Sequence, residues 1–433
     1  MAHGTRIKRA SSGTGSGWRA RLRALRRAAR DAGWAAALLA FGLSRLVYGL
    51  AAGYLAPRLP PSPPWVGQVA APGPRWLALP WRWDAVHYYT IAVGGYGPSP
   101  AAVPKISPFD RLPAFFPLFP LLLRAGATAL GGLRPPPAVP LAAAGAAPLL
   151  AGLFVANAAA LIGLRHLFAL ARPAGAGAAR RAVLYAAVFP FAFCYAVPYT
   201  EGLFLATSTG AFLAARRGRW VRAGLWAAAA GATRPVGLLL LPPLALELGL
   251  AWSRGELAGA ARGRALLGML LAPSGLGLYM LHLWRRVGDP LAWLHTSAIY
   301  FRRDRVAPPV TLWRGLDTVL HPERSANTAD YLVTSLSLAL VLALVIVLAL
   351  SLRRWRPAYG LYGLLLFAVL LAAPLPDARA MFGLPRYGMI FFPTYLTLAR
   401  WGARPAIHRA VVAVSVVLFA LVAALYTRWY FVG

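Results

Sequence analysis

Long apolar runs with few charges recur along the whole chain, and they restrict its fold more than any other feature. A helix that crosses a bilayer needs about 20 mostly apolar residues. Eleven segments approach that length: about 34–56, 139–165, 182–198, 202–215, 220–233, 235–251, 265–284, 331–350, 358–374, 386–399 and 410–427. The mean hydropathy is +0.58, well above that of a typical soluble domain. We therefore predict an all-α polytopic membrane protein with about 11 transmembrane helices.

Basic residues gather in short clusters between these runs. With a cytoplasmic N-terminus, 26 of the 45 Lys and Arg residues fall on the cytoplasmic side, where the acids number only two, Asp31 and Glu256. This asymmetry predicts a basic cytoplasmic tail at 1–33, not cleaved as a signal, and a single membrane domain at 34–428. The net charge of +33 comes with no zinc spacing or RNA-binding signature, which argues against nucleic acid as a partner.

Two connections on the outer side are long, 57–138 and 285–330, and long connections in compact proteins are often functional. The charge asymmetry is consistent only if 113–131 does not cross the membrane. Its prolines would break a straight span near the start, so we expect a juxtamembrane helix on the outer surface. A second break is expected at Thr233-Arg234-Pro235, between two short spans.

The stretch WRWDAVHYYTIAVGG contains Asp84, one of only 12 acids in the chain. A helix is expected over 85–93, closed by Gly94-Gly95, with Asp84, His87 and Tyr88 on one face. Asp84 either caps this helix or acts as a base at the rim of the bilayer. Two nearby cations, Arg82 and Arg111, would offset its loss of water. The flanking tryptophans are typical of membrane-interface anchors.

Three further charged residues lie at expected helix ends on the outer side. Glu201 either complements the dipole of the helix that follows it or belongs to a functional site. Arg234, in GATRPVGLLL, and Arg386, in LPRYGMIFFP, either hold a phosphate beside free helix N–H groups or snorkel to lipid headgroups. Histidines occur without ligand spacing, so a metal site has little support. The usual signatures of zinc proteases, P-loop pumps and serine hydrolases are also missing from the sequence.

Six segments follow one another in an order that matches a known family: RWDAVHYYTIAVGGYG, AFFPLFPLLLR, PYTEGLF, GRWVRAGLWAAAAGATRPVGLLL, GDPLAWLHTSAIYFRR and LPRYGMIFFP. Together they resemble the PIG-V family, which includes the eukaryotic GPI mannosyltransferase II and bacterial PIG-V-like mannosyltransferases. The resemblance covers about 75–400. It implies the GT-C fold, with an active site that faces the lumen or periplasm.

The resemblance also implies roles for individual residues. Asp84 matches the family's essential acid of the first outer loop, and Glu201 matches the acid of a "YSE"-like motif in which Thr200 replaces the commoner serine. The catalytic residues would be Asp84 and Glu201. The substrate-binding residues would be Arg82, His87, Tyr88, Arg111, Tyr199, Arg234, Arg386 and Tyr387. No cofactor is implied, and the question of a divalent metal stays open.

The reaction implied is an inverting transfer of a hexose, mannose by the family's name, from a polyprenyl-phosphate sugar. The acceptor would be a lipid, glycolipid or glycan. The Ala, Arg, Gly and Pro content suggests a GC-rich bacterial genome, and hence a bacterial cytoplasmic membrane with the site on its periplasmic face. Two alternatives remain: a transporter or flippase of a lipid-linked sugar, and an assembly subunit that has kept the fold without the activity.

Overall fold

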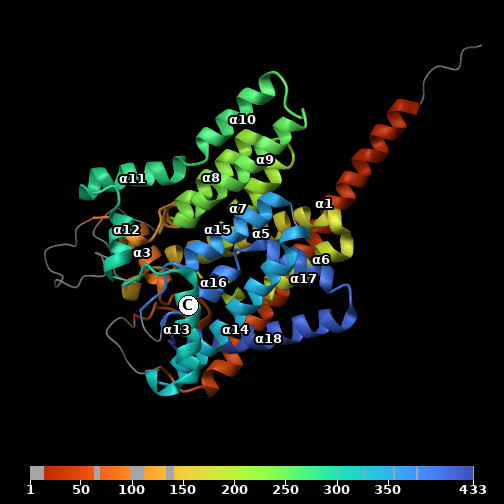
Figure 1. Ribbon diagram of the computed structural model, residues 1–433. Coiled ribbons are helices and arrows are strands. Elements are labelled where there is room, and N and C mark those ends of the chain that lie inside the picture. Colours follow the sequence, from red (N-terminus) through yellow and green to blue (C-terminus); the bar gives the residue numbers. More distant parts are fainter. Residues whose placement is uncertain are drawn as a thin grey trace, which may run out of the picture.

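The computed structural model describes residues 14–62, 69–97, 112–132, 141–300, 302–325, 327–354, 356–376 and 379–432. Within these ranges the chain forms helices and connecting turns, with no β-strand (Figure 1). The predicted all-α fold is confirmed. Arg111 lies outside the described residues, so its predicted part in a site stays a prediction.

Within the described ranges, six helical segments are long and apolar enough to cross a membrane, which agrees with a polytopic membrane protein. They are Asp31–Arg58, Ala146–Ala174, Pro235–Ser253, Ala260–Val287, Asp330–Ser351 and Pro405–Thr427. They overlap α1 (Thr14–Leu50), α5 (Ala146–Ala171), α9 (Leu241–Ser253), α10 (Ala260–Leu271), α11 (Ser274–Val287), α14 (Thr328–Ser351) and α18 (Pro405–Thr427). Each overlaps a predicted span. The total of about 11 crossings stays a prediction.

Several predicted spans are not continuous α-helices: 265–284 is divided between α10 and α11, and 235–251 begins as a 3-10 segment. Two further spans are broken near prolines. The segment 182–198 contains the end of α6 (Ala176–Ala187) and a short 3-10 turn, Ala192–Tyr195. The segment 386–399 is divided between α16 (Leu384–Gly388) and α17 (Phe392–Trp401). Proline explains both breaks, because it lacks the N–H that would continue the preceding helix. Pro190 follows α6, and Pro393 stands in the first turn of α17.

The centre of the molecule is α7 (Glu201–Ala215), in which every residue is buried. It packs against α5 and against α8 (Trp220–Thr233), and α15 (Pro357–Leu371) lies nearby in the middle of Figure 1. Small residues allow the close approach of α5 and α7. A Cβ added to Gly163 would lie 3.0 Å from the backbone nitrogen of Ala206, a contact typical of membrane helices that pack backbone to backbone.

Shorter helices occupy the two predicted outer connections. The first contains α2 (Arg75–Ala78), α3 (Asp84–Gly94) and α4 (Leu118–Ala129), and the second contains α12 (Ala292–Tyr300) and α13 (Pro308–Leu320). In Figure 1 the helices α3, α12 and α13 lie toward the left, whereas the far end of α1 projects at the right. The predicted helix within 113–131 is α4, which begins directly after Pro117. Its position on the outer surface stays a prediction.

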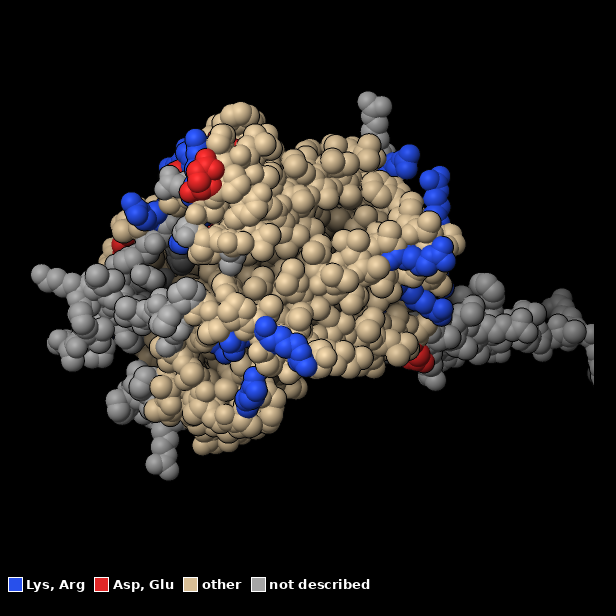
Figure 2. Space-filling model, turned by 90° about the horizontal axis from the view of Figure 1, so that it is seen from below, with Lys and Arg blue, Asp and Glu red and all other residues tan. Residues whose placement is uncertain are grey.

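Charged side chains follow the same division. In Figure 2 many of them lie toward the left and right ends of the visible face, and a further group of basic side chains lies at its lower centre. Acidic groups are mixed with basic groups at the left, whereas the right end is almost entirely basic. The middle and upper part of this face is largely uncharged, as expected of a protein that lies across a bilayer.

Candidate active site

The turn before α3 is held in a strained conformation that fixes the start of the helix. Trp83 has a φ of +53°, which a residue with a Cβ rarely adopts and which costs on the order of 1–3 kcal/mol. Trp81 is fully buried, and a Cβ on Gly152 of α5 would lie 2.5 Å from its ring. The anchor interpretation is therefore wrong for Trp81, because its ring fills a gap against α5.

Asp84 is the first residue of α3, and the helix ends as predicted, at Gly95 with a φ of +74°. The position before the helix belongs to Trp83, which makes no side-chain capping bond. Asp84 does not serve as the cap. Instead its Oδ2 lies 2.8 Å from Nη2 of Arg386, and 19% of its side chain is exposed. Its carboxylate therefore remains within reach of a substrate.

Glu201 is the first residue of α7, and its side chain is fully buried. Its Oε1 forms an ion pair with Arg386, whose Nε lies 2.8 Å away, and accepts a hydrogen bond from Nη2 of Arg234. Arg386 therefore bridges the two carboxylates that the sequence singled out. We call Asp84, Glu201, Arg234 and Arg386 the acid–arginine cluster. Its formal charge is zero, as expected for charges that are largely buried and stable only when paired.

Arg234 lies at the predicted break, where α8 ends and a 3-10 segment begins at Pro235. It is 7% exposed, and Arg386 is 8% exposed, so neither snorkels toward headgroups. The Nε of Arg234 donates to Oγ1 of Thr200 at 2.7 Å, and the Tyr88 hydroxyl lies 3.3 Å from the same Oγ1. No pattern in the sequence predicts this contact of Thr200. Its position beside Glu201 was the only signal that could have indicated one.

Aromatic rings support both arginines. The guanidinium carbon of Arg386 lies 5.1 Å from the ring centre of Tyr199, and that of Arg234 lies 5.3 Å from the ring centre of Tyr387. At these distances the negative faces of the rings attract the cations. The structure thus brings together two predicted carboxylates, two predicted arginines and three predicted tyrosines, Tyr88 included.

Arg303 is a further cation near the site, because it interacts electrostatically with the hydroxyl of Tyr387, as do Arg234 and Arg386. The Nη1 group of Arg303 donates to the carbonyl of Ala373 at 2.7 Å. No motif in the sequence indicated this arginine.

Two other predicted residues lie beside the cluster. The backbone carbonyl of Arg82 accepts from the hydroxyl of Tyr426 at 3.3 Å, and its guanidinium carbon lies 4.4 Å from the ring centre of Trp429. Arg82 therefore faces the C-terminal segment. The ring of His87 stacks at 4.5 Å on that of Phe115.

Some polar atoms of the site are buried without a hydrogen-bond partner within the described ranges. They include Nη1 of Arg234, Oε2 of Glu201, and Nε and Nη1 of Arg82. Arginine N–H groups in this condition are suited to an anionic ligand. Among all the residues that the structure describes, no three His, Cys, Asp or Glu side chains lie close enough together to hold a metal ion.

No family model matches the sequence, and no curated protein matches it. Three solved structures of an Archaeoglobus fulgidus oligosaccharyltransferase are similar. The apo form has 13% identity and a TM-score of 0.46, and the form with Zn and sulfate has 14% and 0.45. The third, AglB with an inhibitory peptide and a dolichol-phosphate, has 12% and 0.41. In the same order, the matches cover 91%, 90% and 91% of this chain and 56%, 53% and 55% of the other chain. This chain therefore spans little more than half the length of the structures that it matches. Membership of the PIG-V family stays a prediction.

Proposed function

We propose that this protein is a membrane glycosyltransferase of the GT-C type that moves a hexose from a polyprenyl-phosphate sugar to a lipid, glycolipid or glycan acceptor. The observation that carries the proposal is the pairing of a partly exposed carboxylate, Asp84, with a buried, neutral cluster rich in arginine. A base and several cations are what a displacement with a phosphate leaving group requires.

In the proposed reaction the acceptor hydroxyl attacks the anomeric carbon and gives its proton to Asp84. The bond between that carbon and the phosphate oxygen breaks, and the phosphate leaves with the electron pair, so the configuration at carbon inverts. Glu201 is fully enclosed and acts by positioning Arg386 and Arg234. A phosphate is already a good leaving group, so no strong acid is required opposite the base.

The acid–arginine cluster becomes more positive during this step, which favours the departure of the phosphate. Before reaction, two carboxylates balance two guanidiniums. Proton transfer to Asp84 leaves the cluster with one net positive charge while negative charge develops on the phosphate. In a site shielded from water this charge stabilises the transition state more than the ground state. The Nη1 group of Arg234 is the donor best suited to the leaving oxygen, because no described residue accepts from it.

Mannose is proposed as the sugar, and the bacterial cytoplasmic membrane as the location, with the cluster on the periplasmic face and the N-terminus in the cytoplasm. These details follow from the family resemblance, the composition and the charge asymmetry. The connections predicted to be outer contain Asp84 on α3, and the opposite end carries the basic clusters.

The test is transfer by purified protein in detergent, supplied with a panel of radiolabelled polyprenyl-phosphate sugars and a lipid extract as acceptor. We expect labelled product without any ion gradient, which a transporter would not give. Asp84→Asn should reduce turnover at least about a hundredfold, the contribution typical of a positioned base. Asp289→Asn is the matched control, because that exposed acid contacts His295 and lies outside the cluster. Near-normal turnover in Asp84→Asn would refute the role of Asp84.

A further inference from the structure

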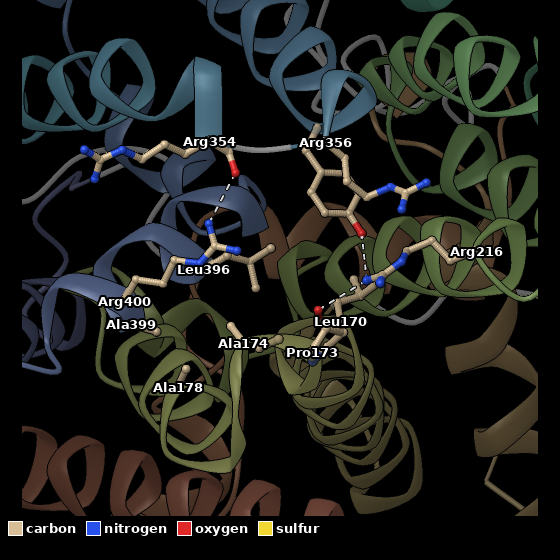
Figure 3. Close-up of a pocket in the computed structure, with 12 residues that line it drawn as sticks. Leu170, Pro173, Ala174, Ala178, Arg216, Arg354, Arg356, Leu396, Ala399 and Arg400 are labelled. Atoms are coloured by element: carbon tan, nitrogen blue, oxygen red, sulfur yellow. Dashed lines mark hydrogen bonds between the residues drawn. The ribbon is translucent and has the colours of Figure 1, made fainter. Parts of the chain in front are cut away.

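A cavity of about 210 Å³ lies at the other end of α7, away from Glu201. Its walls come from the ends of α5 and α17, the first turns of α6 and α15, and Arg216, which directly follows α7. Four arginines line it: Arg216, Arg354, Arg356 and Arg400. We call this cavity the arginine pocket, and Figure 3 shows it between Arg400 and Arg216, above a floor formed by Pro173, Ala174 and Ala178.

The pocket has a large excess of positive charge. Arg356 forms two bonds with Glu247, from Nε at 2.8 Å and from Nη2 at 2.6 Å. None of the other three arginines forms an ion pair with a carboxylate of the described residues. Positive-inside topology explains why arginines are common on this side. It does not explain why they surround a cavity, where like charges repel one another unless an anion is present.

The guanidiniums are held in position but keep donors available. The Nη1 group of Arg216 donates to the carbonyl of Leu170 and to the hydroxyl of Tyr359, both at 3.3 Å (Figure 3). The Nη1 group of Arg400 donates to the carbonyl of Arg354, also at 3.3 Å. A guanidinium has five N–H donors, so each of these side chains can bind a further acceptor without losing its anchor.

Two helix N-termini add to the positive field. Ala178 and Tyr359 are the third residues of α6 and α15, and both line the pocket. Neither helix has an acidic residue in its first turn or a side-chain cap, whereas α3 and α7 each begin with an acid. First-turn N–H groups and the helix dipole favour an anion.

We infer that the arginine pocket binds a phosphate monoester. The forked donors of arginine match phosphate oxygens, and a dianion would neutralise most of the unpaired charge. A cavity of about 210 Å³ has room for a phosphate group. The phosphate comes either from a lipid headgroup or from free phosphate. This inference is independent of the proposed glycosyl transfer.

The experiment compares two probes on the purified protein. Phosphatidic acid in phosphatidylcholine nanodiscs supplies the lipid phosphate, and inorganic phosphate, against chloride at equal ionic strength, supplies the free ion. Bound lipid is counted by native mass spectrometry, and ion binding is followed by thermal shift. Binding of phosphatidic acid alone identifies a headgroup site, and binding of both probes identifies a site for the free ion as well.

Substitutions connect the binding to the pocket. Arg216→Ala and Arg400→Ala should each weaken binding about tenfold or more, and Arg216→Lys, which keeps the charge but loses the fork, should also weaken it. Arg222→Ala removes an exposed charge of α8 outside the pocket and should have no effect. The melting temperature without ligand checks that each variant is folded. The inference is overturned if neither probe binds, or if Arg222→Ala lowers binding as much as Arg216→Ala.

Discussion

The two ends of α7 both gather arginines, but they treat the positive charge in opposite ways. At the Glu201 end, two buried guanidiniums meet two carboxylates. At the Arg216 end, four guanidiniums line an open cavity, and among the described residues only that of Arg356 pairs with a carboxylate, Glu247. The 15 residues of α7 separate the two ends by about 22 Å. Arginine paired with acid thus builds a fixed site, whereas arginine without acid keeps its donors for a ligand.

The largest expected loss of stability comes from removing a carboxylate at the buried Glu201 end of α7. Glu201→Gln leaves two buried guanidiniums with a single acid, so we expect the free energy of unfolding to fall by about 3–5 kcal/mol. Unfolding in dodecyl maltoside titrated with SDS measures this. Glu256→Gln is the control, because its partner Arg254 lies 3.7 Å away and both side chains are more than half exposed. Equal losses in the two variants would contradict the buried pairing.

A smaller loss should follow from removing the hydroxyl that joins Arg234 to Tyr88. Thr200→Val keeps the shape but leaves the Nε of Arg234 without its acceptor, so we expect a loss of about 1–3 kcal/mol in the same titration. Thr207→Val is the matched control on α7, because its hydroxyl bonds only to carbonyls of its own helix. If Thr207→Val costs more, Thr200 does not support the cluster.

The arginine pocket should tolerate the loss of a cation. Without phosphate present, Arg216→Ala should change the free energy of unfolding by no more than about 0.5 kcal/mol, since no carboxylate is left unpaired. The SDS titration in chloride buffer measures this change. A loss as large as that of Glu201→Gln would show that Arg216 is a structural residue, and the contrast between the two ends would fail.

The smallest expected difference between the two ends of α7 is in their response to salt. Raising sodium chloride from about 0.05 M to about 0.5 M shortens the screening length severalfold. We expect phosphate binding at the open arginine pocket to weaken, measured by thermal shift. The stability difference between wild type and Glu201→Gln should change little, because the cluster is buried. Equal sensitivity at both ends would mean that water reaches the cluster freely.

Local patterns in the sequence predicted local structure well. Hydropathy predicted a span over 331–350, and the helix is Asp330–Ser351. Glycine and proline predicted the end of α3 at Gly95 and the break at Arg234. These features depend on residues close together in the chain, where propensity and steric restriction are sufficient. Pro393, which lies within 386–399, was visible too, but the apolar character of that segment favoured a continuous span.

The contacts of the site could not be predicted in the same way. Asp84 was expected to cap a helix or to act as a base, and nothing near it in the sequence indicates that Arg386 pairs with it. That pairing depends on how α3, α7 and α16 pack, as does the bond from Arg234 to Thr200. The resemblance to a family indicated several residues of the site from the sequence, but it did not indicate which residues they contact.

Because no side chain of α7 reaches the surface, this helix has no position at which substitutions can accumulate without consequence. We expect a saturation mutagenesis library to tolerate almost nothing along the whole length of α7, and to accept varied residues on the exposed face of α18. A change at mid-helix would have to be matched by compensating changes in α5 or α8. In related sequences we therefore expect residues that face each other across these interfaces to covary.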